Sequence, residues 1–109
     1  MVGAYTEVVR SLIMENCTIH QSYLADSILG TSTKIGAGLM TANKRFDRQP
    51  VSTLIKGKTV STDRQALGII TGQATATGIR VSTMPGILIG SGQTIMPTTL
   101  VTKNLDHTT

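Results

Sequence analysis

The sequence predicts an all-β fold, a parallel β-helix whose coils are built from six-residue sides. The first observation is a grid of glycines spaced by six residues or a multiple of six: Gly30, Gly36, Gly72, Gly78 and Gly90. The residue before each grid position is expected to point into the solenoid, a set that includes Leu29, Ile35, Thr71, Thr77, Ile89, Ile95 and Val101. A strict short period is typical of a β-helix, because one residue per side faces inward and a small residue then lets the chain turn.

The second observation is a shortage of large side chains. Only Tyr5, Tyr23 and Phe46 are aromatic among the 109 residues, and there is no tryptophan. A globular core of this size usually contains more aromatic residues. The core of a solenoid is one side chain wide, and each coil stacks on its neighbour. We therefore expect a single solenoid domain over residues 1–109.

The six-residue period varies along the chain. Residues 1–16 carry paired apolar residues and are expected to be strand-like. Residues 17–29 are less regular, because Leu24 and Leu29 are five residues apart. The period returns over 31–41 and is almost unbroken over 71–101. The polar tail, 104–109, is expected to fray.

Residues 44–66 interrupt the period with a polar and basic stretch. Within it, the segment VSTLIKGKTVST predicts a short hairpin that turns at Lys56, Gly57 and Lys58. We expect a loop extruded from one corner of the solenoid. Insertions in solenoids collect on one face, and that face often binds a ligand.

Three successive inward positions are polar: Thr71, Thr77 and Thr83. Threonine is β-branched and fits a strand. A buried hydroxyl without a partner costs about 1–3 kcal/mol. A ladder of the three threonines could satisfy their hydroxyls, so we interpret them as tolerated inside the solenoid and not as functional residues.

The net charge is +4, and basic residues cluster in the interruption: Lys44, Arg45, Arg48, Lys56, Lys58 and Arg64. Such a segment either attracts phosphate-bearing ligands or is a solvated loop, and the sequence leaves both open. A nucleic-acid partner is not expected, because no recognised DNA- or RNA-binding motif is visible in the sequence. Cys17 is the only cysteine, and no apolar run approaches the ~18 residues of a membrane helix. The sequence therefore suits a cytoplasmic protein without a membrane segment.

Three segments carry a resemblance: IHQSYLADSILG, TKIGAGLMTAN and VSTMPGILIGSGQTIMPTTLVTKNL. Together they resemble the C-terminal domain of the bifunctional sugar-1-phosphate nucleotidylyltransferase/amino-sugar acetyltransferases, with archaeal relatives the more similar, over about residues 4–105. The resemblance implies a left-handed β-helix, a homotrimer, acetyl-CoA as cofactor and a hexosamine 1-phosphate as substrate. Left-handedness is unusual, since nearly all parallel crossovers are right-handed.

The resemblance also implies roles for individual residues. His20, three residues before Tyr23, would be the general base that takes a proton from the sugar amine. Tyr23 would contact the sugar phosphate, and Asn43 would hold the amino sugar. The backbone N–H of Ala37 would bind the thioester carbonyl as charge develops on its oxygen. Lys103 would meet the coenzyme A phosphates.

The chain departs from the family pattern in several places. The Gly-Asp turn after the tyrosine is Ala25-Asp26 here. A lysine that grips the sugar phosphate has no direct counterpart, and Arg10 is the candidate to replace it. Met84 stands beside the expected pantetheine arm, where the family has a small residue. The family's nucleotidylyltransferase domain, with its glycine-rich loop, has no counterpart in these residues.

Two functions follow, an acetyltransferase or a catalytically silent trimerisation module of a nucleotidylyltransferase. Four of the proposed site residues also have a structural interpretation: His20 as a surface or satisfied histidine, Ala37 as a turn residue, Asn43 as a cap of the corner before the loop, and Lys103 as a solvated cation. Carbonic anhydrases of this architecture bind a metal ion through three histidines. The chain has only His20 and His107, so no metal is expected.

Overall fold

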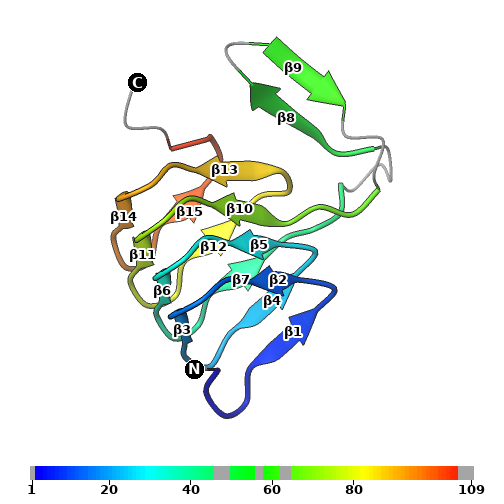
Figure 1. Cartoon of the computed structure of the whole chain (residues 1–109). Helices are drawn as coiled ribbons and strands as arrows, with labels where there is room; N and C mark the ends of the chain where they lie inside the picture. The colour runs from blue at the N-terminus through cyan, green and yellow to red at the C-terminus, as the bar shows by residue number, and fades with distance from the viewer. Residues whose placement is uncertain (1, 46–49, 56–57, 62–64, 106–109) are drawn as a thin grey trace.

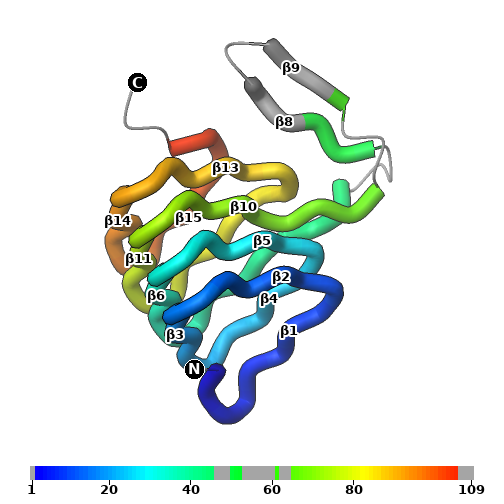
Figure 2. Tube along the Cα trace, viewed as in Figure 1, coloured from blue at the N-terminus to red at the C-terminus, as the bar shows by residue number. Residues whose placement is uncertain are grey.

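The computed structural model describes residues 2–45, 50–55, 58–61 and 65–105, and most of these residues form a stack of triangular coils (Figures 1 and 2). Three parallel sheets form the walls. Sheet A contains β3 (Thr18–Ile19), β6 (Lys34–Ile35), β11 (Ala76–Thr77) and β14 (Thr94–Ile95). Sheet B contains β1 (Glu7–Val9), β4 (Tyr23–Ala25), β7 (Met40–Thr41), β12 (Ser82–Thr83) and β15 (Leu100–Val101). Sheet C contains β2 (Leu12–Ile13), β5 (Ile28–Leu29), β10 (Ile69–Thr71) and β13 (Ile87–Ile89).

The chain visits the walls in the fixed order B, C, A, so every neighbour within a wall is parallel. The near strands β5, β10 and β13 all run in the same direction in Figure 1 as the chain climbs from the N-terminal to the C-terminal end. The predicted fold class is confirmed: the chain is a single-stranded left-handed parallel β-helix. Among the described residues, no helix has the length and apolarity needed to cross a membrane.

The irregular spacing before Leu29 reflects a shorter coil. Leu12 pairs with Ile28, an offset of 16 residues, whereas Ile70 pairs with Leu88, an offset of 18. Two of the three sides of the shorter coil have five residues and one has six, and the inward residues Leu24 and Leu29 remain buried. Leu24 and Leu29 both have 0% of their surface exposed.

The predicted inward residues form the core. Leu29, Ile35, Ile89, Ile95 and Val101 are all buried, as expected. A second inward position, two residues before the first, was not predicted; it holds Cys17, Thr33, Leu39, Thr75, Val81 and Ile87. Six sides thus contribute two buried residues each, which makes the core denser there than a single inward residue per side would allow.

The predicted threonine ladder is wrong, although all three threonines are buried. Thr71, Thr77 and Thr83 belong to one coil and lie on three different walls, so they cannot stack on each other. The Thr71 hydroxyl instead lies 3.1 Å from Thr33 Oγ1 and accepts from Gly30 N. The Thr77 hydroxyl accepts from Gly36 N, and Thr83 Oγ1 has no partner among the described residues.

The interruption leaves the solenoid at Asn43 and rejoins it at Leu67, whose N–H donates to Asn43 O at 2.8 Å. The predicted hairpin is present as antiparallel β8 (Ser52–Ile55) and β9 (Lys58–Ser61). Lys58 lies in the strand opposite Ile55, not in the turn. The predicted turn residues Lys56 and Gly57 lie outside the described residues.

The predicted tail begins later than residue 104. Leu105 N donates to Leu88 O, and Asn104 Oδ1 accepts from Leu88 N. These contacts extend the last coil along sheet C. Residues 106–109 lie outside the described part of the chain.

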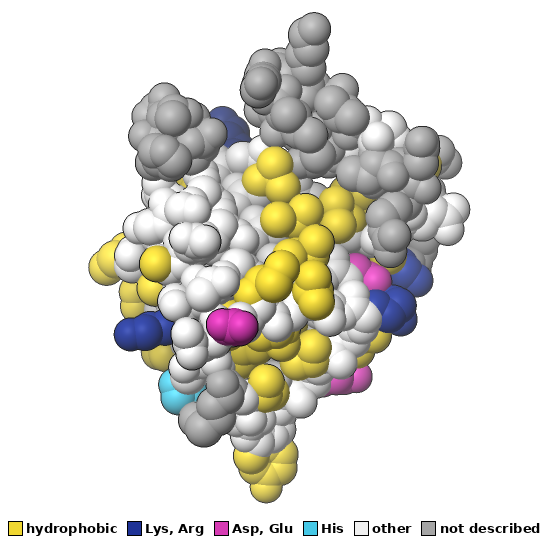
Figure 3. All heavy atoms as spheres, viewed as in Figure 1, with side chains coloured by type: hydrophobic (Ala, Val, Ile, Leu, Met, Phe, Trp, Pro, Cys, Tyr) yellow, Lys and Arg dark blue, Asp and Glu magenta, His cyan; other side chains and the backbone are white. Residues whose placement is uncertain are grey.

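The outer faces of the walls differ in polarity. The outward column of sheet C is entirely apolar: Leu12, Ile28, Ile70 and Leu88. Figure 3 shows hydrophobic side chains running along this face. The outward column of sheet B contains Tyr23, Met40, Ser82 and Leu100. The outward column of sheet A is more polar: Thr18, Lys34, Ala76 and Thr94.

Candidate functional site

All seven residues proposed from the sequence border the outer face of sheet B. His20 and Ala37 lie where the chain passes from sheet A to sheet B, which we call the A–B edge. Four others lie where the chain passes from sheet B to sheet C, the B–C edge: Arg10, Asn43, Met84 and Lys103. Tyr23 begins β4, between the two edges.

His20 and Ala37 occupy successive coils of the A–B edge. His20 N donates to Ile35 O at 3.2 Å, and Gly38 N donates to Gln21 O at 2.6 Å, so these two corners stack directly. The Ala37 N–H makes no hydrogen bond with the described residues, which leaves it available as a donor. The structure therefore brings an imidazole and a free backbone N–H to one edge.

Two open hollows lie along this edge. His20 is exposed and lines a hollow of about 430 Å³, together with Lys34 and Thr77. Tyr23 and Ala37 line a second hollow of about 580 Å³. The polar residues of the second hollow include Glu7, Gln21 and Arg80. A ligand that reached both hollows would cross the A–B edge, from the outer face of sheet A to the start of sheet B.

The His20 ring has no hydrogen-bond partner among the described residues. A histidine base is usually oriented by a partner on its other nitrogen, because that contact fixes which nitrogen carries the proton. Lys34, in the same hollow, is a donor only and cannot accept that proton. Within one chain, the imidazole is present without the group that would orient it.

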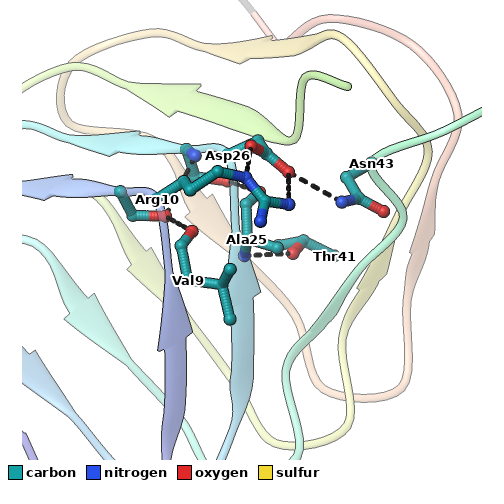
Figure 4. A network of polar contacts seen from close by, with 8 residues as sticks. Val9, Arg10, Ala25, Asp26, Thr41 and Asn43 are labelled. Atoms are coloured by element: carbon teal, nitrogen blue, oxygen red, sulfur yellow. Dashed lines mark hydrogen bonds and ion pairs between the residues drawn. The ribbon is translucent and has the colours of Figure 1, made fainter. Parts of the chain in front are cut away.

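The B–C edge is organised by the buried carboxylate of Asp26 (Figure 4). Arg10 Nε donates to Asp26 Oδ1 at 2.7 Å, and Arg10 Nη2 donates to Oδ2 at 3.0 Å. Asn43 Nδ2 donates to the same Oδ2 at 2.7 Å. The Asp26 side chain is 1% exposed and that of Arg10 is 61% exposed, so the arginine covers the carboxylate from the solvent side. The hydrogen bond to Asp26, with the carboxylate charge, raises the pKa of Arg10 above its ordinary value.

Met84 and Lys103 lie on the two coils above Asn43. β7, β12 and β15 pair in register, with Thr41 beside Thr83 and Thr83 beside Val101, so the residues that follow these strands stack at the B–C edge. Met84 is 39% exposed, and Lys103 is also exposed. A long ligand could follow this edge from Asn43 toward Lys103.

Two residues of the site were missed. The sequence places Asp26 only in a turn, although a carboxylate at a solenoid corner, one 16-residue coil after Arg10, indicates an ion pair with that arginine. Lys34 precedes the inward Ile35, so it had to face outward, and the 16-residue offset places it beside Thr18, two residues before His20. Knowing the offset, and not only the six-residue period, would have identified it.

No metal-binding cluster forms in the part of the chain that is described: no three His, Cys, Asp or Glu side chains come together there. His107 lies outside the described residues.

The parallel walls, short sides and single extruded loop define the chain as a hexapeptide-repeat β-solenoid. Comparison with known proteins confirms the resemblance drawn from the sequence. The chain is 44% identical over 107 residues to the bifunctional protein GlmU of Methanococcus maripaludis, and 39% identical over 107 residues to the bifunctional sugar-1-phosphate nucleotidylyltransferase/acetyltransferase of Sulfurisphaera tokodaii. Each alignment covers 97% of the chain. The chain is thus related to a segment of these bifunctional proteins.

The relatives are longer than this chain. The chain spans about a quarter of the length of these two curated relatives, 26% and 27%. The chain is also 32% identical over 105 residues to the protein of Escherichia coli named "Putative uncharacterized acetyltransferase YaiX". This alignment covers 95% of the chain and 46% of YaiX. No family model matches the chain.

Proposed function

We propose that the chain transfers the acetyl group of acetyl-CoA to the amine of a hexosamine 1-phosphate. The observation that supports this function is the pairing of His20 with the free N–H of Ala37 on successive coils of the A–B edge. A base and an oxyanion donor at one edge are the two groups that acyl transfer requires. Two relatives whose names include acetyltransferase also support an acetyltransferase function.

In this proposal, the sugar amine attacks the thioester carbonyl carbon. The carbon–nitrogen bond forms while His20 accepts the amine proton, and the Ala37 N–H donates to the developing oxyanion. The carbon–sulfur bond then breaks, and the coenzyme A thiolate takes the proton from His20. Tyr23 contacts the sugar phosphate and Asn43 the amino sugar, while Met84 and Lys103 lie along the path of coenzyme A.

The proposal includes a homotrimer. A closed ring needs two different, complementary surfaces on each subunit. The apolar outer face of sheet C and the mixed face of sheet B, with its exposed Met40 and Leu100, supply two such surfaces. Packing sheet C of one subunit over sheet B of the next would enclose the hollow beside Tyr23 and Ala37.

One observation favours the second candidate function, a catalytically silent trimerisation module. Arg10 and Asn43 were both expected to hold the sugar, yet both side chains bind Asp26. A site in which these two sugar-binding side chains serve only the protein would be a structural remnant. The proposed function requires that Asn43 still offers its second amide atom to a ligand.

The test follows acetyl transfer from acetyl-CoA to glucosamine 1-phosphate and to galactosamine 1-phosphate, with calorimetric binding of coenzyme A in parallel. Turnover by the wild-type protein is expected. Absence of turnover, together with absence of coenzyme A binding, would favour the trimerisation module.

A further inference from the structure

Asp26 binds three separate parts of the B–C edge. Its carboxylate accepts from Arg10 on the coil before and from Asn43 on the coil after. Its carbonyl oxygen accepts from Gly68 N at 2.8 Å, where the chain returns from the 44–66 excursion. Both ends of the excursion are therefore attached to this one residue.

The carboxylate also decides how the Asn43 amide is oriented. An ionised carboxylate only accepts hydrogen bonds, so the Asn43 atom that faces Asp26 at 2.7 Å must be the amide nitrogen. Asn43 Oδ1 then points away from Asp26, as Figure 4 shows. No described residue donates to this oxygen. The edge therefore presents an oriented acceptor, and an asparagine without this contact could present either end.

From these contacts we propose that Asp26 is the positioning residue of the sugar site. It fixes Asn43 as a hydrogen-bond acceptor toward an ammonium or hydroxyl group of the amino sugar. The assignment rests on the function proposed above. It also resolves the apparent conflict at Asn43, because the amide nitrogen serves the fold and the amide oxygen remains for the ligand.

The burial of the Asp26 carboxylate is what holds the Asn43 amide in one orientation. The Asp26 side chain is almost fully removed from water, so its charge needs the donors of Arg10 and Asn43. Turning the Asn43 amide over would place its oxygen against the carboxylate and remove one of those donors. An amide oxygen held in one orientation binds a donor without the cost of ordering it at the moment of binding.

The test compares Asp26→Asn with Ser11→Ala in the acetyl-transfer assay. Ser11 is at the same corner, where its hydroxyl donates to Val9 O and accepts from Ser27 N, and it does not touch the carboxylate. In Asp26→Asn, the neighbouring amide can donate as well as accept, so Asn43 is no longer held in one orientation. We expect a rise of about threefold to tenfold in KM for the amino-sugar phosphate, the loss of one hydrogen bond. KM for acetyl-CoA should stay unchanged.

A swapped pair separates positioning from folding. Asn43→Asp places two carboxylates together and should raise KM for the sugar strongly. The double variant Asp26→Asn, Asn43→Asp restores one donor and one acceptor across the contact and should recover part of that loss. Melting temperatures of all variants are measured alongside, and Ser11→Ala should lower the melting temperature without changing KM.

The results distinguish this assignment from the proposed function. A wild-type protein that turns over while Asp26→Asn keeps its wild-type KM overturns the assignment alone. A swapped pair that recovers melting temperature but no sugar affinity also overturns it. A wild-type protein that neither transfers acetyl groups nor binds glucosamine 1-phosphate overturns the proposed function and this assignment with it.

Discussion

Gly30 lies directly against Gly72 of the next coil. A Cβ on Gly30 would come within 2.3 Å of the Gly72 carbonyl oxygen and within 2.8 Å of the Thr71 carbonyl oxygen. Both obstacles are backbone atoms, which cannot move without opening the stack. The glycine grid of the sequence is therefore a requirement for close approach between coils.

The first prediction compares Gly30→Ala with Gly92→Ala. Gly30→Ala should lower the free energy of unfolding at the upper end of the roughly 1–3 kcal/mol range for overpacking. Gly92 has a φ of 76° but open space around it, so alanine there costs only the left-handed conformation, about 1 kcal/mol. Denaturant unfolding at a fixed protein concentration measures both. Equal losses would contradict the close approach.

The second prediction concerns two buried threonines of one coil. Thr83→Val removes a hydroxyl that has no partner among the described residues, so it should raise the free energy of unfolding by about 1 kcal/mol. Thr71→Val removes the contacts to Gly30 N and Thr33 Oγ1 and should lower it by about 1 kcal/mol. Because both variants carry the same Thr→Val substitution, the sign of the change in the free energy of unfolding shows whether the lost hydroxyl had a hydrogen-bond partner. A loss at Thr83 would mean that its hydroxyl has a partner.

The third prediction tests the apolar face of sheet C. Ile28→Glu places a charge in the middle of the apolar column and should shift the proposed trimer toward monomer, as measured by light scattering across a concentration series. Thr94→Glu is the control, because it adds the same charge to the outer face of sheet A. Dissociation of the trimer by Thr94→Glu and not by Ile28→Glu would mean that sheet A, and not sheet C, forms the contact between subunits.

The fourth prediction concerns the proposed chemistry. His20→Ala should reduce the rate of acetyl transfer by about 10²–10⁴-fold, the usual contribution of a general base. Tyr23→Phe should cost less, because it removes one hydroxyl and leaves the base. Gln73→Ala, an exposed corner residue that borders neither hollow, is the control. Turnover that survives His20→Ala would assign the base to another residue.

The sequence predicted the strands of the walls well because the six-residue period is a pattern of neighbouring residues in the chain. An inward residue followed by a glycine reports both burial and a tight corner, so Leu29 and Ile35 could be placed without knowledge of any distant contact. The threonines of one coil were misplaced because the six-residue period does not say which sides stack. That information lies in the offset between coils, which changes from 16 to 18 residues along the chain.

The site was only partly accessible from the sequence for the same reason. His20 and Ala37 were named from local motifs, and their shared edge follows from the offset between coils. Asp26 depends on Arg10 and Asn43, which are 16 and 17 residues away. A contact that joins three coils leaves no periodic trace, because each partner occurs once.

The neck of the excursion has a consequence for how this chain can be altered. Met40 pairs with Ser82 at an offset of 42 residues, and Ser82 pairs with Leu100 at an offset of 18. The solenoid thus resumes in phase after 24 additional residues, with the two ends joined by the Leu67–Asn43 hydrogen bond. The entropic cost of closing a loop rises only slowly with the length of the loop, so this corner should tolerate inserted segments of different lengths. We therefore expect that the excursion can be exchanged or shortened while the coils on either side keep their register.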